Sequence, residues 1–89
     1  MTKFIVTGDY CAEVLEKRGP HRQAHLDRLK QQKEDGVLVT IGPTKDLKQF
    51  FAIYDASSED DVHTLIEGDP YWQNGIWTSY QILEWIQAI

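Results

Sequence analysis

The chain has 89 residues, of which 42% are hydrophobic and 26% charged, a composition typical of a folded protein. This length supplies a single hydrophobic core, so we expect one domain over residues 1–89. A net charge of -5 disfavours binding to nucleic acid, and no apolar run approaches the roughly 20 residues of a membrane-spanning helix. The single Cys11 allows no internal disulfide, and we therefore expect a soluble cytoplasmic protein without nucleic-acid or membrane partners.

The first half of the chain predicts a strand, a helix and a second strand. Residues 3–8 are rich in β-branched and aromatic side chains, which is typical of a strand. Residues 20–35 are rich in helix formers, and Gly19-Pro20 suits the first turn of a helix. Residues 37–41 are a short apolar run that ends at Gly42-Pro43, which indicates a strand followed by a turn.

The second half predicts a strand, a helix and a long final strand. Residues 50–54 should pair with the preceding strand as a hairpin across the polar loop 44–49. Residues 58–67 should form a helix, because Ser57 or Ser58 can cap it and acidic residues fill its first turn. Residues 76–86 alternate as a strand. This order predicts an α+β fold with a four-stranded sheet.

Both faces of the expected sheet are apolar. Phe50 and Tyr54 alternate with Phe51 and Ile53, although two helices cover only one face of such a sheet. The two alternating sets of the last strand are apolar as well: Trp77 and Trp85 in one, and Ile76, Tyr80, Ile82 and Ile86 in the other. We therefore predict a homodimer built sheet to sheet, the alternative being a monomer whose loops or long side chains shield the second face.

A histidine in the first helix is the main candidate for acid–base chemistry. His25 has Arg22 three residues before it and Leu29 four residues after it, so it shares a face with a cation and a core residue. Because the ordinary pKa of histidine lies near neutral pH, His25 could transfer protons; it could also be a hydrogen-bonded histidine at the edge of the core. Arg22 belongs to a basic stretch, residues 17–33, that could attract a small anion or simply form a solvated surface.

Two aspartates compete as a partner for this histidine. Asp35 lies ten residues further along the same helix, about 15 Å of rise, which is too far for a hydrogen bond to His25. Asp69 precedes Pro70, so it should lie at a turn after the second helix and could point inward. It could equally accept hydrogen bonds from nearby backbone amides, and spacing alone does not separate the two roles.

The remaining reactive residues carry weaker signals. His21 and His25 have the spacing of two metal ligands, but no third ligand is evident and no metal site is expected. His63 lies in the acidic helix and is expected to be exposed and without function, and Cys11 to be an inert thiol. Tyr71 is the best candidate for lining a substrate pocket among the aromatic residues near the C-terminus.

A set of motifs in a fixed order resembles the YciI-like (YCII-related) family. The set comprises Arg22-x-x-His25-Leu26, Gly36, Gly42-Pro43, Ser58, Asp69-Pro70-Tyr71 and an aromatic final strand. The resemblance spans nearly the whole chain. It implies a ferredoxin-like βαββαβ subunit with an antiparallel sheet, paired into a dimeric α+β barrel in which the two sheets face each other.

The same resemblance implies a function. Family members are similar in having a His and an Asp at the positions of His25 and Asp69, discussed as an active-site dyad. The family is also similar to dehydrochlorinase-like, muconolactone-isomerase-like and monooxygenase-like proteins that act on small cyclic organic compounds without metal. The loop 44–49 is shorter here than the Gly-rich insertion of longer members, which bears on substrate size.

Our leading hypothesis is a cofactor-independent lyase or isomerase. His25 would move a proton on a small organic substrate, aromatic or anionic, Asp69 would orient the imidazole, and Arg22 and Tyr71 would bind the substrate. One alternative is a noncatalytic small-ligand-binding or accessory protein that uses the same pocket. Another is a purely structural dimerisation module.

Overall fold

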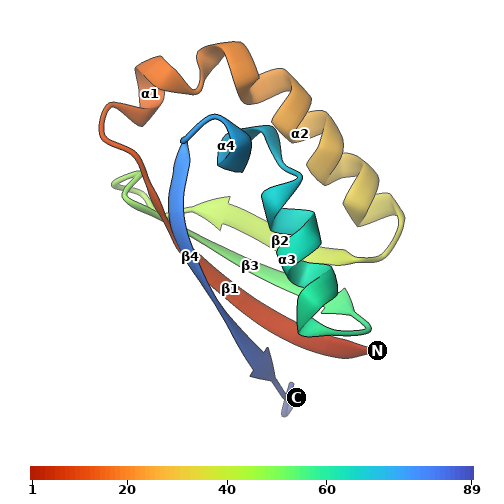
Figure 1. The fold of residues 1–89 in the computed structure, drawn as a ribbon. Coiled ribbons are helices and arrows are strands. Elements are labelled where there is room, and N and C mark those ends of the chain that lie inside the picture. Colours follow the sequence, from red (N-terminus) through yellow and green to blue (C-terminus); the bar gives the residue numbers. More distant parts are fainter.

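The computed structural model describes residues 1–89, and its helices all lie on one side of a curved sheet (Figure 1). The predicted order of six main elements is confirmed, and two four-residue helices, α1 and α4, are added to it. In chain order the elements are β1 (Thr2–Tyr10), α1 (Val14–Lys17), α2 (Gly19–Glu34), β2 (Leu38–Pro43), β3 (Gln49–Ala56), α3 (Glu59–Glu67), α4 (Pro70–Gln73) and β4 (Trp77–Trp85).

The sheet has the strand order β2-β3-β1-β4, and every neighbouring pair is antiparallel. β2 and β3 are adjacent, as the predicted hairpin requires. β1 lies between β3 and β4, so that Val6 of β1 stands opposite Ala52 of β3 on one side and Ile82 of β4 on the other. This arrangement is the ferredoxin-like α+β fold that the sequence predicts.

The helix ends follow from local sequence. Pro20 lies in the first turn of α2, and Gly36, just beyond the C-cap, has φ +80, a left-handed conformation that glycine adopts without strain. At the start of α3 the Ser58 hydroxyl accepts a hydrogen bond from the Asp61 backbone N–H at 3.2 Å. No helix of the protein is both long and apolar enough to cross a lipid bilayer.

The core lies between the sheet and the helices. Val6 and Ala52 on the sheet and Val62 and Ile66 on α3 are fully buried in it. On the opposite face of the sheet no element covers the side chains, and Phe51 and Leu83 are 42% and 52% exposed. The apolarity predicted for both faces is therefore present, and one of the two faces is open in the single chain.

The last strand departs from simple alternation. Opposite Asp9 and Tyr10 of β1, the register of β4 passes from Ser79 directly to Trp77, so one residue of β4 is extra. Simple alternation groups Trp77 with Trp85, but this bulge turns Trp77 onto the helix-covered face, where it is 2% exposed. The predicted grouping of the two tryptophans is therefore wrong: they lie on opposite faces because an irregularity reverses the alternation between them.

Gly8 provides a test of packing in the centre of the sheet. A Cβ atom added there would overlap the Phe50 ring and the Ser79 carbonyl oxygen, whereas one added at Gly19 would meet nothing. We expect Gly8→Ala to lower the free energy of unfolding by about 1–3 kcal/mol, the usual cost of overpacking a core. Urea unfolding measures this effect, with Gly19→Ala as the matched control; equal midpoints for the two variants would contradict the packing.

Candidate active site

A buried hydrogen bond joins the two residues that sequence analysis singled out. Nδ1 of His25, on α2, lies 2.7 Å from Oδ1 of Asp69, and the two residues are only 5% and 1% exposed. They are 44 positions apart in the sequence. The carboxylate is acceptor-only, so Nδ1 carries the proton and Nε2 is the imidazole nitrogen left without a protein partner.

Asp69 is held in place by the turn that it starts. It is the N-cap of α4, and its Oδ1 also accepts the Tyr71 backbone N–H at 2.8 Å. Residue spacing leaves open whether the Asp69 carboxylate accepts hydrogen bonds from nearby backbone amides or points inward to a partner. The structure shows that one oxygen atom does both, which fixes the carboxylate against rotation.

Aromatic rings enclose the imidazole of His25. The Tyr71 ring stacks on it with a centroid distance of 3.6 Å and an interplanar angle of 6°, and Trp77 meets it edge-on at 5.2 Å. Trp77 is itself stacked on Phe50 at 4.3 Å. The imidazole plane is therefore fixed by packing on one side and by Asp69 along its edge.

A cavity of about 110 Å³ adjoins His25. Its rim carries two arginines, Arg18 and the exposed Arg22, neither of which forms an ion pair. They are four residues apart, so both lie on the same side of the chain where α2 begins. The cavity thus combines one imidazole with two unpaired cations, and its other lining residues are Tyr10, Leu26, Leu29, Ile41, Gly42, Pro43, Tyr71 and Trp77.

The tyrosines around the site are held in the neutral form. Burial raises the pKa of Tyr71, and the nearby guanidinium groups of Arg18 and Arg22 oppose that rise. Burial likewise raises the pKa of Tyr54, with the charge of Asp69 adding to the effect. The interior of the site therefore disfavours further negative charge, whereas its rim favours it.

The sequence matches the YCII-related domain over residues 2–86. The chain belongs to the YCII-related family. No curated protein matches the sequence of this YCII-related protein.

Solved structures share the fold. One is 5-chloro-2-hydroxyhydroquinone dehydrochlorinase from Burkholderia phenoliruptrix AC1100 in complex with 2,5-dihydroxybenzoquinone, with 26% identity, a TM-score of 0.83, and coverage of 97% of this chain and 95% of that one. A NIPSNAP family protein from Agrobacterium tumefaciens has 14% identity and a TM-score of 0.58, covering 96% and 90% of the two chains. An antibiotic biosynthesis monooxygenase has 8% identity and a TM-score of 0.59, covering 100% of each.

Other candidate residues of this YCII-related protein lie away from the cavity. Asp35 caps the C-terminus of α2, is exposed and accepts a hydrogen bond from the Gln31 side chain, so it has no contact with His25. Cys11 is partly exposed and lines a separate, more open hollow beside α1. His21 is half-buried, and no group of three or more metal-ligating side chains occurs in the protein.

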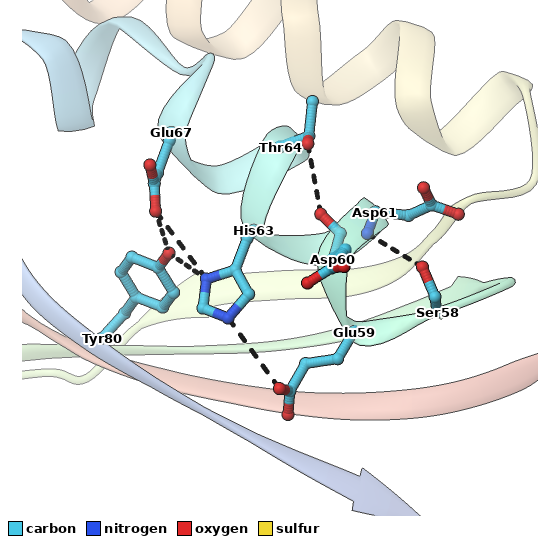
Figure 2. Close-up of polar contacts among 8 residues, drawn as sticks. All are labelled: Ser58, Glu59, Asp60, Asp61, His63, Thr64, Glu67 and Tyr80. Atoms are coloured by element: carbon cyan, nitrogen blue, oxygen red, sulfur yellow. Dashed lines mark hydrogen bonds and ion pairs between the residues drawn. The ribbon is translucent and has the colours of Figure 1, made fainter.

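The prediction that His63 is exposed is wrong. Its imidazole lies between Glu59 and Glu67 on α3 and bonds the Tyr80 hydroxyl of β4, as Figure 2 shows. Tyr80 in turn donates to Glu67. The sequence places His63 among acidic neighbours but does not show that β4 passes beside this helix, which is why the half-buried position was missed.

Three cavity residues that carry hydrogen-bond donors lie outside the predicted site. Tyr10 lies at the end of β1, Arg18 belongs to the basic stretch 17–33, and Trp77 is one of the aromatic residues near the C-terminus, among which Tyr71 is the preferred pocket candidate. The sequence carries no signal for Arg18, because it precedes Gly19-Pro20 and the helix predicted over residues 20–35; in the structure its backbone is helical just before α2. Tyr10 and Trp77 carry none, because their meeting depends on the bulge in β4.

The tyrosines predict a pH dependence. The pKa values of Tyr10, Tyr54, Tyr71 and Tyr80, all the tyrosines of the chain, are raised, in each case chiefly by burial. Above the ordinary pKa of about 10 the unfolded chain therefore loses phenolic protons before the folded one does, and this contribution to the free energy of unfolding falls as pH rises. Below that pH the contribution is fully present.

Tyrosinate absorbance, measured against pH for the native and the urea-unfolded protein, tests this expectation. The native curve should lie at clearly higher pH than the unfolded curve. Coincident curves would show that the hydroxyls are solvated in the folded state.

Proposed function

We propose that this YCII-related protein is a small cofactor-independent enzyme that moves a proton on a small hydroxylated aromatic or quinone-like substrate. The observation that carries the proposal is the buried His25–Asp69 bond beside a cavity with two unpaired arginines. It is supported by the family membership and by the similarity to a dehydrochlorinase that binds 2,5-dihydroxybenzoquinone. A cavity of about 110 Å³ is smaller than typical ligand pockets of roughly 300 Å³ or more, which limits the ligand to a small molecule.

In this proposal His25 is the proton carrier and Asp69 its positioning residue. Because Asp69 accepts from Nδ1, the lone pair of His25 resides on Nε2, the nitrogen without a protein partner. When Nε2 takes a proton, the carboxylate stabilises the resulting imidazolium through the same hydrogen bond. No atom has to be rearranged between the two states, so little reorganisation opposes the proton transfer.

Arg22 and Tyr71 would bind the substrate at the mouth of the cavity. Arg22 is exposed at the rim and has no ion-pair partner, so its guanidinium is available to an anionic oxygen. Tyr71 is 3% exposed and already stacked on His25, so its ring mainly holds the imidazole plane and leaves its hydroxyl end near the arginines. The substrate would lie between these cations and Nε2.

The proposed reaction balances without a redox partner. The substrate reacts as its keto tautomer, in which the ring carbon that bears the leaving group is tetrahedral. Nε2 of His25 removes a proton from a ring carbon or hydroxyl conjugated with the carbonyl, and the electrons of the broken C–H or O–H bond form an enolate. The enolate then either expels a leaving group such as chloride, in a lyase reaction, or is reprotonated at another position, in an isomerisation. In the lyase case His25 finally passes its proton to solvent.

Replacement of the dyad tests this function. With 5-chloro-2-hydroxyhydroquinone as the first probe, we expect chloride release by the native protein and a loss of roughly 100-fold or more in kcat for His25→Ala, the usual contribution of a general acid–base group. Asp69→Asn should also lower kcat, because the neutral amide no longer stabilises the imidazolium. His21→Ala, four residues away and outside the cavity, is the matched control. Ion chromatography of chloride gives the rates.

Two results would contradict the enzyme. Turnover that survives His25→Ala in folded protein would show that the imidazole is not the proton carrier. Binding of 2,5-dihydroxybenzoquinone that depends on His25, with no turnover of any related compound, would instead indicate a ligand-binding or accessory protein.

We further propose that the protein works as a cytoplasmic homodimer joined through the open face of the sheet. That face carries a cluster of half-buried and exposed apolar side chains: Ile5, Phe51, Ile53, Leu83 and Trp85. A soluble monomer rarely leaves so continuous an apolar surface in water, and a second copy of the same face would cover it. The single Cys11 suits a reducing compartment.

A charge placed on this face should separate the dimer. We expect the native protein to sediment as a dimer and Leu83→Lys as a monomer, because the lysine would be buried without a partner in the interface. Leu15→Lys is the matched control, since Leu15 is 61% exposed and belongs to α1, away from the open face of the sheet. A native monomer, or an unchanged Leu83→Lys dimer, in analytical ultracentrifugation would rule out this interface.

A further inference from the structure

The bulge in β4 brings a tryptophan into the candidate site. Without it Trp77 would follow Ser79 onto the open face; with it Trp77 stands opposite Tyr10 and lines the cavity beside His25. Bulges are common next to active sites because one extra residue redirects a side chain without disturbing the rest of the sheet. The bulge thus brings the indole of Trp77 and the phenol of Tyr10, on the adjacent strands β4 and β1, to the same cavity.

The indole N–H is buried without a completed hydrogen bond. Trp77 is 2% exposed, and its Nε1 has no partner that meets hydrogen-bond geometry. Trp77 is paired with Tyr10 across β4 and β1, and both residues line the cavity. Burial raises the pKa of Tyr10, and the Trp77 N–H and then Arg18 oppose that rise. The donor therefore faces the phenol oxygen but does not complete the bond, and a small movement of Tyr10 would satisfy it.

We propose that the Tyr10 hydroxyl is the oxyanion donor of this cavity and that Trp77 acts through it as a positioning residue. Tyr10 is half-buried and lines the cavity, so its O–H can reach a bound oxygen. When Tyr10 moves to complete this bond in the ligand complex, the indole N–H of Trp77 donates to the phenol oxygen, which polarises the O–H and strengthens its hydrogen bond to the ligand. Catalytic hydrogen bonds often tighten only when the ligand binds.

This inference rests on the proposed function and narrows its substrate class. The enolate formed when His25 removes a proton develops negative charge on the former carbonyl oxygen, and a neutral donor suits an oxygen that is uncharged before reaction. The arginines at the rim suit a group that is already ionised. The preferred substrate would therefore carry two oxygens: one ionised oxygen at Arg18 and Arg22, and one carbonyl oxygen at Tyr10.

Binding of 4-nitrophenol tests the donor without requiring turnover. Its phenolate oxygen stands in for the enolate oxygen that develops at Tyr10, and its nitro group, which nitrobenzene shares, stands in for the group held by the arginines. The phenolate is coloured, so absorbance reports both binding and ionisation, and nitrobenzene serves as the ring without an oxyanion. We expect Tyr10→Phe to weaken phenolate binding by roughly tenfold, the worth of one hydrogen bond to a charged group, and to leave nitrobenzene binding unchanged. The pKa of bound nitrophenol should be lowered in the native protein and less so in this variant.

A double-mutant cycle separates positioning from packing. Trp77→Phe keeps an aromatic ring against Phe50 but removes the N–H, and we expect phenolate binding to fall roughly threefold in the native background and not at all in the Tyr10→Phe background. Tyr80→Phe and Trp72→Phe remove the same groups outside the cavity and are the controls. Circular dichroism verifies that each variant is folded.

The outcomes distinguish this inference from the function on which it rests. Native-like phenolate binding by Tyr10→Phe, or no binding of nitrophenol to the native protein, would overturn the oxyanion donor even where His25→Ala abolishes turnover. Equal losses for phenolate and nitrobenzene would overturn it as well, since they indicate lost packing. Selective loss of phenolate binding supports the donor even where no substrate is turned over.

Discussion

The hydrogen bond between His25 and Asp69 is the constraint on which the site depends. It joins α2 to the start of α4 in the interior, where an unpaired imidazole or carboxylate would be strongly destabilising. The same carboxylate oxygen caps α4 and thereby sets where Tyr71 stacks. One buried pair therefore fixes the distance between two helices, the plane of the imidazole and the nitrogen that remains free for chemistry.

The aromatic side chains around this pair divide the cavity into two chemically different ends. Tyr71 and Trp77 form aromatic walls against His25, with Phe50 stacked on Trp77, whereas Arg18 and Arg22 lie at the rim. Apolar walls exclude water and strengthen each electrostatic interaction inside them. A net charge of -5 on the whole chain makes two unpaired arginines at one opening more informative than they would be on a basic protein.

Proteins that share this fold bear the names of different functions, so the fold alone does not assign one to this chain. A dehydrochlorinase, a NIPSNAP family protein and a monooxygenase share this arrangement of strands and helices, the last two at 14% and 8% identity. At such low sequence identities a structural similarity establishes the shared fold and nothing about function. The functional proposal for this chain therefore rests on the side chains around His25, each of which can be substituted separately.

Local sequence patterns predict the order of the main elements and the apolarity of both sheet faces, whereas the pairing of His25 with Asp69 is implied only by the resemblance to the YciI-like family, because spacing leaves the role of Asp69 open. Alternation and capping are local, so they could be read from residues a few positions apart, and the helix rise alone excluded Asp35. Three features are visible only in the tertiary structure. Trp77 enters the cavity, Tyr10 lies beside it, and His63 contacts β4. These depend on strand register and on a one-residue bulge, which long-range pairing sets and no local pattern records.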